Sequence, residues 1–172
     1  MVLCYIDCIN KISEYLDVTP GKLYMNENQT ITAETVKNNE IIQGFSTLIQ
    51  ALVKNSKCPG ILGNDKEMQA LTRQWLEYIV LCISYSDSGA NTIRILKELN
   101  IALRDRTYIT GTTKTIADIT LYYALHSIMN TLNNQEKAKY IHVSRWFDNM
   151  QQEEKLRKTL DMISFNLVHL YL

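Results

Sequence analysis

Proline and glycine are scarce in this sequence, with two and six occurrences among 172 residues. Disordered and low-complexity segments are usually rich in such residues, so we expect no long disordered segment. Charge of one sign is also lacking, because 18 acidic side chains balance 18 basic ones. A chain without a sustained basic stripe is not expected to bind nucleic acid directly and tightly. A nucleic-acid-contacting accessory domain therefore ranks third among the functions that we consider for this sequence, after the two described below.

Long apolar runs are absent as well. Asp7, Lys11 and Glu14 interrupt the first apolar stretch, and no later run approaches the length of a membrane span. We therefore expect a soluble protein of the cytoplasm, with the nucleus as a second location, and no membrane partner. The four cysteines form no CxxC pair. No histidine at ligand spacing stands near Cys4 and Cys8, so neither a metal nor another cofactor is expected.

The sequence does contain an ordered series of secondary-structure patterns. Residues 2–16 have the apolar spacing of an amphipathic helix, short strand-like runs follow within residues 22–42, and another helix follows Gly44. Further along the chain only helical patterns occur. We predict an α/β plus all-α fold with two parts, a lobe of residues 1–60 and a helical domain of residues 64–172.

The first helix of the predicted helical domain extends from Asp65, a typical N-cap residue, to about Tyr85. Its apolar residues recur at helical spacing and define a predicted core side. The residues of that side are Met68, Leu71, Trp75, Tyr78, Ile79 and Cys82.

The clearest local motif is GTTKTIADITLYY, residues 111–123. Thr115 and Asp118 have the spacing of a capping box, in which the Thr115 hydroxyl accepts from the Asp118 N–H and the Asp118 carboxylate accepts from the Thr115 N–H. The carboxylate would also lie at the positive end of the helix dipole. Apolar residues occur on both sides of the helix that follows. We therefore interpret Asp118 as a structural cap of a buried central helix, not as a general base.

The short helix after the strand-like runs has apolar residues on two sides. Leu48 and Leu52 suffice to attach it to its own lobe. Phe45, Ile49 and Val53 form a second apolar face, which in a short helix favours an interface with a partner protein. The alternative is that these three side chains pack against a loop of the same chain.

The capping motif also points to a family. The pattern G-x-x-x-T-x-A-D, here Gly111, Thr115, Ala117 and Asp118, resembles the start of the buried helix in glutathione-transferase-like proteins. Lys114 stands where the hydrophobic staple residue would be. Four longer stretches, QWLEY, TYITG, TIADITLYYALH and QEKAKYIHVSRWF, narrow the resemblance. Together they resemble the eukaryotic elongation factor one epsilon subunit family, also called the third aminoacyl-tRNA synthetase complex-interacting multifunctional protein family.

The resemblance implies a glutathione-transferase-like fold, with a reduced thioredoxin-like N-terminal lobe and a helical C-terminal domain. It also implies a non-catalytic scaffold that joins the multi-aminoacyl-tRNA synthetase complex. In this family the partners are the similar domains of methionyl-tRNA synthetase and glutamyl-prolyl-tRNA synthetase, besides other subunits of the complex. The face of Phe45, Ile49 and Val53 would then pair with methionyl-tRNA synthetase. Some members are also linked to a nuclear DNA-damage response.

Arg145 is the predicted contact with the second synthetase, because the resemblance places it where the family binds the glutamyl-prolyl partner. Trp146 beside it is interpreted as a core residue, so Arg145 should point outward. Arginine is frequent at binding hot spots. The alternative is a plain solvated arginine. His126, inside an apolar helix, is interpreted as a packing or interface residue.

A divergent glutathione transferase or other thiol-handling enzyme is the alternative function. Such an enzyme needs an activating residue near an opening strand, a cis-proline before the third strand and an acidic–serine turn. Here a helix precedes the first strand-like run, the only prolines are Pro20 and Pro59, and the turn reads QGFS at residues 43–46. Cys4 and Cys8 are candidate nucleophiles, but core thiols are the simpler interpretation. We therefore predict no catalytic activity.

Overall fold

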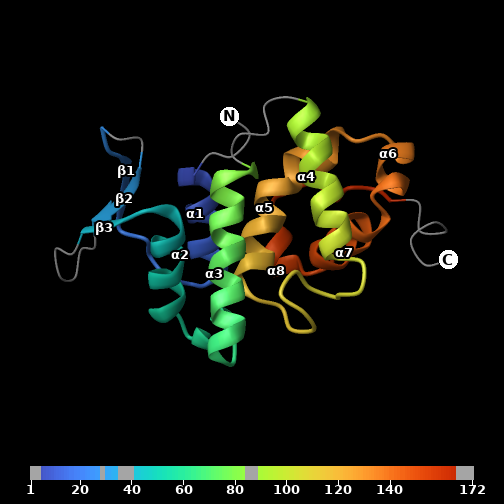
Figure 1. The fold of residues 1–172 in the computed structure, drawn as a ribbon. Helices are drawn as coiled ribbons and strands as arrows, with labels where there is room; N and C mark the ends of the chain where they lie inside the picture. Colours follow the sequence, from blue (N-terminus) through green and yellow to red (C-terminus); the bar gives the residue numbers. More distant parts are fainter. Residues whose placement is uncertain (1–4, 28–29, 35–40, 84–88, 166–172) are drawn as a thin grey trace.

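The computed structural model describes residues 5–27, 30–34, 41–83 and 89–165. A small sheet lies at one side of the molecule and helices form the remainder (Figure 1). The first elements are α1 (Tyr5–Tyr15), β1 (Lys22–Met25), β2 (Ile31–Glu34), β3 (Ile41–Gln43) and α2 (Phe45–Lys54). A 3₁₀ turn, η1 (Pro59–Leu62), leads to α3 (Lys66–Leu81), α4 (Gly89–Ala102), α5 (Ile116–Thr131), α6 (Asn134–Lys139), α7 (Ile141–Gln151) and α8 (Glu154–Arg157).

The sheet is antiparallel, with β2 between β1 and β3. Leu23, Ala33 and Ile42 pair across the three strands, so their side chains share one face of the sheet. All three belong to the apolar core or pack against it. Tyr24 and Ile41 occupy the opposite face and are exposed. One face of the sheet thus contacts the core, and the other exposes Tyr24 and Ile41 but buries Thr32 of the central strand.

α5 is the central helix, as its apolar pattern predicts. Its residues are buried on all sides along most of the helix. α1, α3 and α7 pack around it. The Tyr122 ring, fully buried, lies 4.8 Å from the Phe147 ring of α7, measured between centroids. A helix without a polar face needs partners on every side, and α5 has them.

The buried side of α3 differs from the predicted one. Thr72, Leu76 and Ile79 are buried, whereas the apolar residues Trp75 and Tyr78 of the predicted core side are only half-buried. On this side α3 packs against α5 and α2. Thr72 escaped the prediction because a threonine inside a helix gives no hydrophobic signal. The predicted buried side of α3 is therefore rotated about the helix axis relative to the observed one.

Helix boundaries also differ from the predicted ones by about one turn. α3 ends at Leu81, before the predicted end, and α4 spans Gly89–Ala102, whereas the apolar spacing predicts a helix over about Thr92–Arg106. Gly89 and Ala90 add no apolar side chain to the pattern, so the sequence could not place this start. None of the described helices is long and apolar enough to cross a membrane.

The apolar core is continuous across the predicted boundary between residues 1–60 and 64–172. α2 packs against both α1 and α3. Buried residues of these helices and of α5 form one cluster. The division into two domains thus stays a prediction.

Candidate functional site

The predicted apolar interface on α2 is not exposed. Phe45, Ile49 and Val53 are 5%, 0% and 0% exposed. α2 packs against α1, α3 and the sheet, and the Tyr5 ring of α1 lies 5.2 Å from the Phe45 ring between centroids. The prediction that these three side chains form a free face was wrong, because a helix enclosed by other elements buries apolar residues on two sides without any partner protein. The alternative, packing within the chain, is what the structure has.

The surface that α2 does expose borders a polar groove. Thr47 and Lys54 are exposed, and Gln50 is half-buried. Between α2, η1 and α3 lies a groove of about 240 Å³, here called the α2–α3 groove. Its polar lining residues are Gln50, Lys54, Lys66, Gln69, Thr72 and Arg73.

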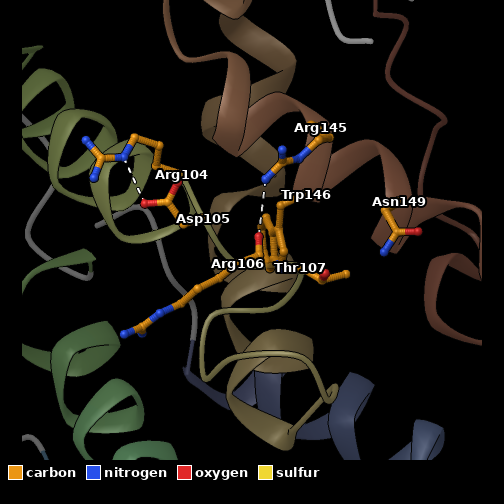
Figure 2. A pocket seen from close by; sticks show the side chains of 7 residues that line it. All are labelled: Arg104, Asp105, Arg106, Thr107, Arg145, Trp146 and Asn149. Atoms are coloured by element: carbon orange, nitrogen blue, oxygen red, sulfur yellow. Dashed lines mark hydrogen bonds and ion pairs between the residues drawn. The ribbon is translucent and has the colours of Figure 1, made fainter.

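Arg145 lies at the second predicted interface, and its guanidinium is held by the chain's own backbone. Its Nη2 donates to the Leu103 carbonyl at 2.9 Å and to the Arg106 carbonyl at 3.2 Å. Figure 2 shows the guanidinium pointing toward the loop that follows α4. The side chain is half-buried. Arg145 is therefore an anchored arginine and not a freely solvated one.

An open pocket of about 460 Å³ surrounds this guanidinium (Figure 2). We call it the Arg145 corner, and its lining residues are Arg104, Asp105, Arg106, Thr107, Arg145, Trp146 and Asn149. The Arg104 Nε donates to the Asp105 carboxylate at 3.0 Å. Arg106 Nη1 donates to the Ile109 carbonyl at 3.2 Å. Hydrogen bonds within the chain thus shape much of the corner.

Asp118 and Trp146 support the corner from beneath. The Trp146 Nε1 donates to Asp118 Oδ1 at 3.0 Å, and the Ile109 N–H donates to the same oxygen at 2.8 Å. The Thr115 N–H donates to Oδ2 at 2.9 Å, which is the half of the capping box formed by the carboxylate. The Thr115 side chain in turn accepts from the Asp118 N–H, so both halves of the predicted capping box are present. The Thr115 hydroxyl also donates to Oδ2 at 3.2 Å.

Asp118 is 0% exposed. Burial raises the pKa of its carboxyl, while the hydrogen bonds from Ile109, Thr115 and Trp146 act in the opposite direction. A buried carboxylate surrounded by donors of its own chain has no access to a substrate. Its position agrees with a cap that joins α5, α7 and the loop between α4 and α5.

A group of charged residues joins the start of the described chain to its end. Lys114, at the place of the missing staple residue, forms an ion pair with Glu153. The Tyr15 hydroxyl of α1 donates to the Glu153 carboxylate at 2.9 Å. Lys155 pairs with Asp17 at 2.8 Å, and Lys158 pairs with Glu14 at 3.0 Å. These two ion pairs and the contacts of Lys114 and Tyr15 with Glu153 are together called the α1–α8 contact. Nothing in the local sequence predicts these pairings, since their partners lie far apart along the chain.

Among the described residues, two that a glutathione transferase could use, Ser46 and Cys8, are buried. The Ser46 hydroxyl, at the start of α2, accepts from Gln50 Nε2 at 3.2 Å, and Ser46 is 5% exposed. Cys8 is buried, and Cys4 lies outside the described residues. His126 Nε2 lies 3.1 Å from the Asp161 carbonyl, as a packing residue would. Among the described residues, no group of His, Cys, Asp or Glu side chains could hold a metal ion.

Comparison with solved structures defines the fold class. A theta class glutathione S-transferase from Xanthomonas axonopodis pv. citri matches with a TM-score of 0.69 and 11% identity over 93% of each chain. A glutathione S-transferase from Pichia kudriavzevii matches with a TM-score of 0.70 and 13% identity, over 90% of this chain and 89% of that one. The protein therefore has a glutathione-transferase-like fold, and the predicted fold class is confirmed.

Sequence relatives narrow the assignment. The Mus musculus protein named eukaryotic translation elongation factor 1 epsilon-1 is 37% identical over 93% of this chain and 92% of that protein. A family model described as nuclear-export cofactor Arc1p matches residues 68–154. The chain belongs to the eukaryotic translation elongation factor 1 epsilon-1 family, as the resemblance predicts.

Two further relatives share less sequence. The Mus musculus bifunctional glutamate/proline–tRNA ligase is 25% identical over 83% of this chain but only 9% of its own length. The Schizosaccharomyces pombe tRNA-aminoacylation cofactor arc1 is 27% identical over 73% of this chain and 26% of that protein. A segment similar to most of this chain thus occurs inside larger proteins of tRNA aminoacylation.

Proposed function

We propose that this protein is a non-catalytic adaptor of a multi-aminoacyl-tRNA synthetase complex. The observation that supports it is the similarity to a short part of the glutamate/proline–tRNA ligase, which covers most of this chain. Because the two segments are similar, an isologous type of contact, which uses the same surface patch on both partners, is available to them. The adaptor would bring synthetases together through two separate surfaces, with no bond made or broken.

The first proposed surface is the Arg145 corner, and its partner is the glutamyl-prolyl-tRNA synthetase. Arg145 is already fixed by two backbone carbonyls, so little side-chain entropy is lost when a partner contacts it. A planar guanidinium can stack or form paired hydrogen bonds with a partner. Trp146 beneath it keeps the corner rigid.

Arg145→Ala tests the first surface. We expect weaker capture of the glutamyl-prolyl partner and unchanged pairing at the second surface. Arg94→Ala is the matched control, since Arg94 is exposed on α4 and its ion pair with Glu98 is long, at 4.0 Å. If both variants bind the glutamyl-prolyl partner equally well, the corner is not its binding surface.

The second proposed surface is the exposed edge of α2 and α3, and its partner is methionyl-tRNA synthetase. The buried residues Phe45, Ile49 and Val53 cannot contact a partner directly. Ala70, an exposed residue of α3 beside the groove, is small enough to let another helix approach closely.

Ala70→Arg tests this second surface. Arginine and alanine both favour helices, so the fold should be kept while the long side chain blocks pairing. Ala90→Arg, also exposed but on α4, is the control. Equal capture of methionyl-tRNA synthetase by the two variants would exclude this surface.

The absence of catalysis is part of the proposal. Ser46 and Cys8 are both buried, which supports the proposal because a thiol substrate has little access to either side chain. Immobilised glutathione should not retain the protein, and conjugation activity should be undetectable. Retention together with turnover that depends on Cys4 or Cys8 would support the alternative, a divergent glutathione transferase.

We also propose a cytoplasmic location, where synthetase complexes work, with a nuclear fraction and a role in the DNA-damage response as the family resemblance implies. Affinity purification from the native cell tests the central claim, because the proposed synthetases should co-purify. Fractionation before and after DNA damage tests the nuclear part. An absence of synthetases from the purified material would overturn the adaptor function.

A further inference from the structure

The α2–α3 groove combines several positive charges with no acidic lining residue. Lys54 is contributed by α2, and Lys66 and Arg73 by α3. Asp65 and Glu67 are near in sequence, but neither lines the groove. Among the described residues, neither Lys54 nor Lys66 has an ion-pair partner. The charged side chains that line the groove are therefore all positive, which favours an anionic ligand.

Arg73 is oriented within this groove by a neutral partner. Its Nε and Nη2 donate to the Gln50 side-chain carbonyl at 3.2 and 3.1 Å. The Gln50 amide nitrogen in turn donates to the Ser46 carbonyl at 3.2 Å. A guanidinium has five N–H donors, so three of them stay available to a ligand. The amide fixes the direction of Arg73 without reducing its charge.

Thr72 adds an observation that is independent of the charges. It is 1% exposed and lines the groove. Its hydroxyl has no hydrogen-bond partner within the part of the chain that the structure describes. A buried hydroxyl without a partner costs free energy, and a ligand oxygen that reaches it from the groove would supply the missing acceptor.

The size of the groove limits what can bind. At about 240 Å³ it is smaller than the roughly 300–1,000 Å³ of pockets that enclose whole drug-sized ligands. Gly63 follows the lining residue Leu62, and the turn there is tightly packed, because a Cβ on Gly63 would lie 2.9 Å from the backbone nitrogen of Gln69, another lining residue. The groove thus has room for a compact charged group.

We infer that the α2–α3 groove is a binding site for a compact oxyanion, a phosphate or carboxylate group. Arg73 and Lys54 neutralise the anion and Thr72 donates to one of its oxygens. Guanidinium groups bind both kinds of oxyanion through charge-assisted hydrogen bonds. The inference depends on the groove's own residues and not on the proposed pairing with a synthetase.

The test uses the full chain at constant ionic strength, set with sodium chloride. Inorganic phosphate and glutarate are titrated in separate arms, and backbone amide chemical shifts are followed by NMR. We expect saturable shifts at the groove residues in at least one arm. Phosphate alone or glutarate alone would assign the oxyanion to that class, and no saturable shift in either arm would overturn the inference.

Three variants make the test specific. Lys54→Gln should weaken binding about tenfold, the effect of one charge-assisted hydrogen bond. Thr72→Val should weaken binding several-fold while thermal stability stays the same or rises, because the unpaired hydroxyl is removed. Lys97→Gln, exposed on α4, is the control and should bind as the parent does. Equal weakening by Lys97→Gln and Lys54→Gln would show general charge screening and contradict a site.

Discussion

The indole of Trp146 and the carboxylate of Asp118 are joined by a buried hydrogen bond of 3.0 Å. The two residues are 28 positions apart, on α7 and on the first turn of α5. This bond fastens the helix that bears Arg145 to the central helix of the fold. The position of the Arg145 corner therefore depends on a residue first noticed as a helix cap.

Replacing Trp146 with phenylalanine should destabilise the protein. The change removes one of the donors to a carboxylate that has no access to water and leaves a small cavity, so we expect a loss of about 1–3 kcal/mol. Urea denaturation measures it. Trp75→Phe is the control, since Trp75 is half-buried and packs at the margin of the core, with its ring edge-on to that of Tyr78. Equal losses in the two variants would mean that the Asp118 bond contributes little.

Ile49→Asp should unfold the protein instead of selectively preventing pairing. Ile49 is 0% exposed, and a carboxylate placed there has no described partner. The expected loss is about 4 kcal/mol or more. Thr47→Asp is the matched change on the exposed side of α2, where stability should stay within about 0.5 kcal/mol. A folded, stable Ile49→Asp protein would show that this part of α2 is more accessible than the structure has it.

Gly63→Ala tests the tight turn between η1 and α3. Gly63 has φ of +124°, and an added Cβ would lie 2.9 Å from the Gln69 nitrogen and from the Met68 side chain. Strained backbone of this kind typically costs about 1–3 kcal/mol. The same change at Gly89, where nothing lies within 4 Å of the added Cβ, should leave the melting temperature unchanged or raise it. An unaffected Gly63→Ala protein would contradict the tight packing.

Asp17 should titrate below the ordinary aspartate pKa of 3.8, because its carboxylate accepts a hydrogen bond from Lys155. Its contribution to stability is therefore complete above pH 3.8 and is lost as the pH falls through the lowered pKa. An NMR titration of the Asp17 carboxyl measures the value directly. In Lys155→Met the pKa should return toward the ordinary value. No change on substitution would show that the ion pair does not form in solution.

The hydrophobic pattern of the sequence predicted a helix or strand well where the surroundings of that element are uniform. α5 is apolar throughout, and both the helix and its burial were evident from the sequence. β1, β2 and β3 are short, yet each coincides with an alternating or apolar run between turn residues. The family resemblance, carried mostly by residues after Asp65, supplied the fold class that periodicity alone could not.

The candidate site was less predictable, for physical reasons. Two apolar sides on α2 fit equally an interface and an enclosed helix, and only the arrangement of α1 and α3 decides between them. Arg145 was chosen by resemblance, but its anchoring on the Leu103 and Arg106 carbonyls depends on backbone geometry. The α2–α3 groove escaped notice because its cations are separated in sequence and become neighbours only when two helices pack.

The α1–α8 contact has a consequence for synthesis on the ribosome. Tyr15 and Glu153 are separated by 138 residues, so α1 must wait on the order of ten seconds at ordinary elongation rates before its partner has been translated. Until α5 has been translated, the apolar side of α1, with Ile9 and Ile12, also lacks part of its final cover. During this time α2, which follows soon after α1 in the sequence and packs against it in the fold, is the helix that can cover this apolar side.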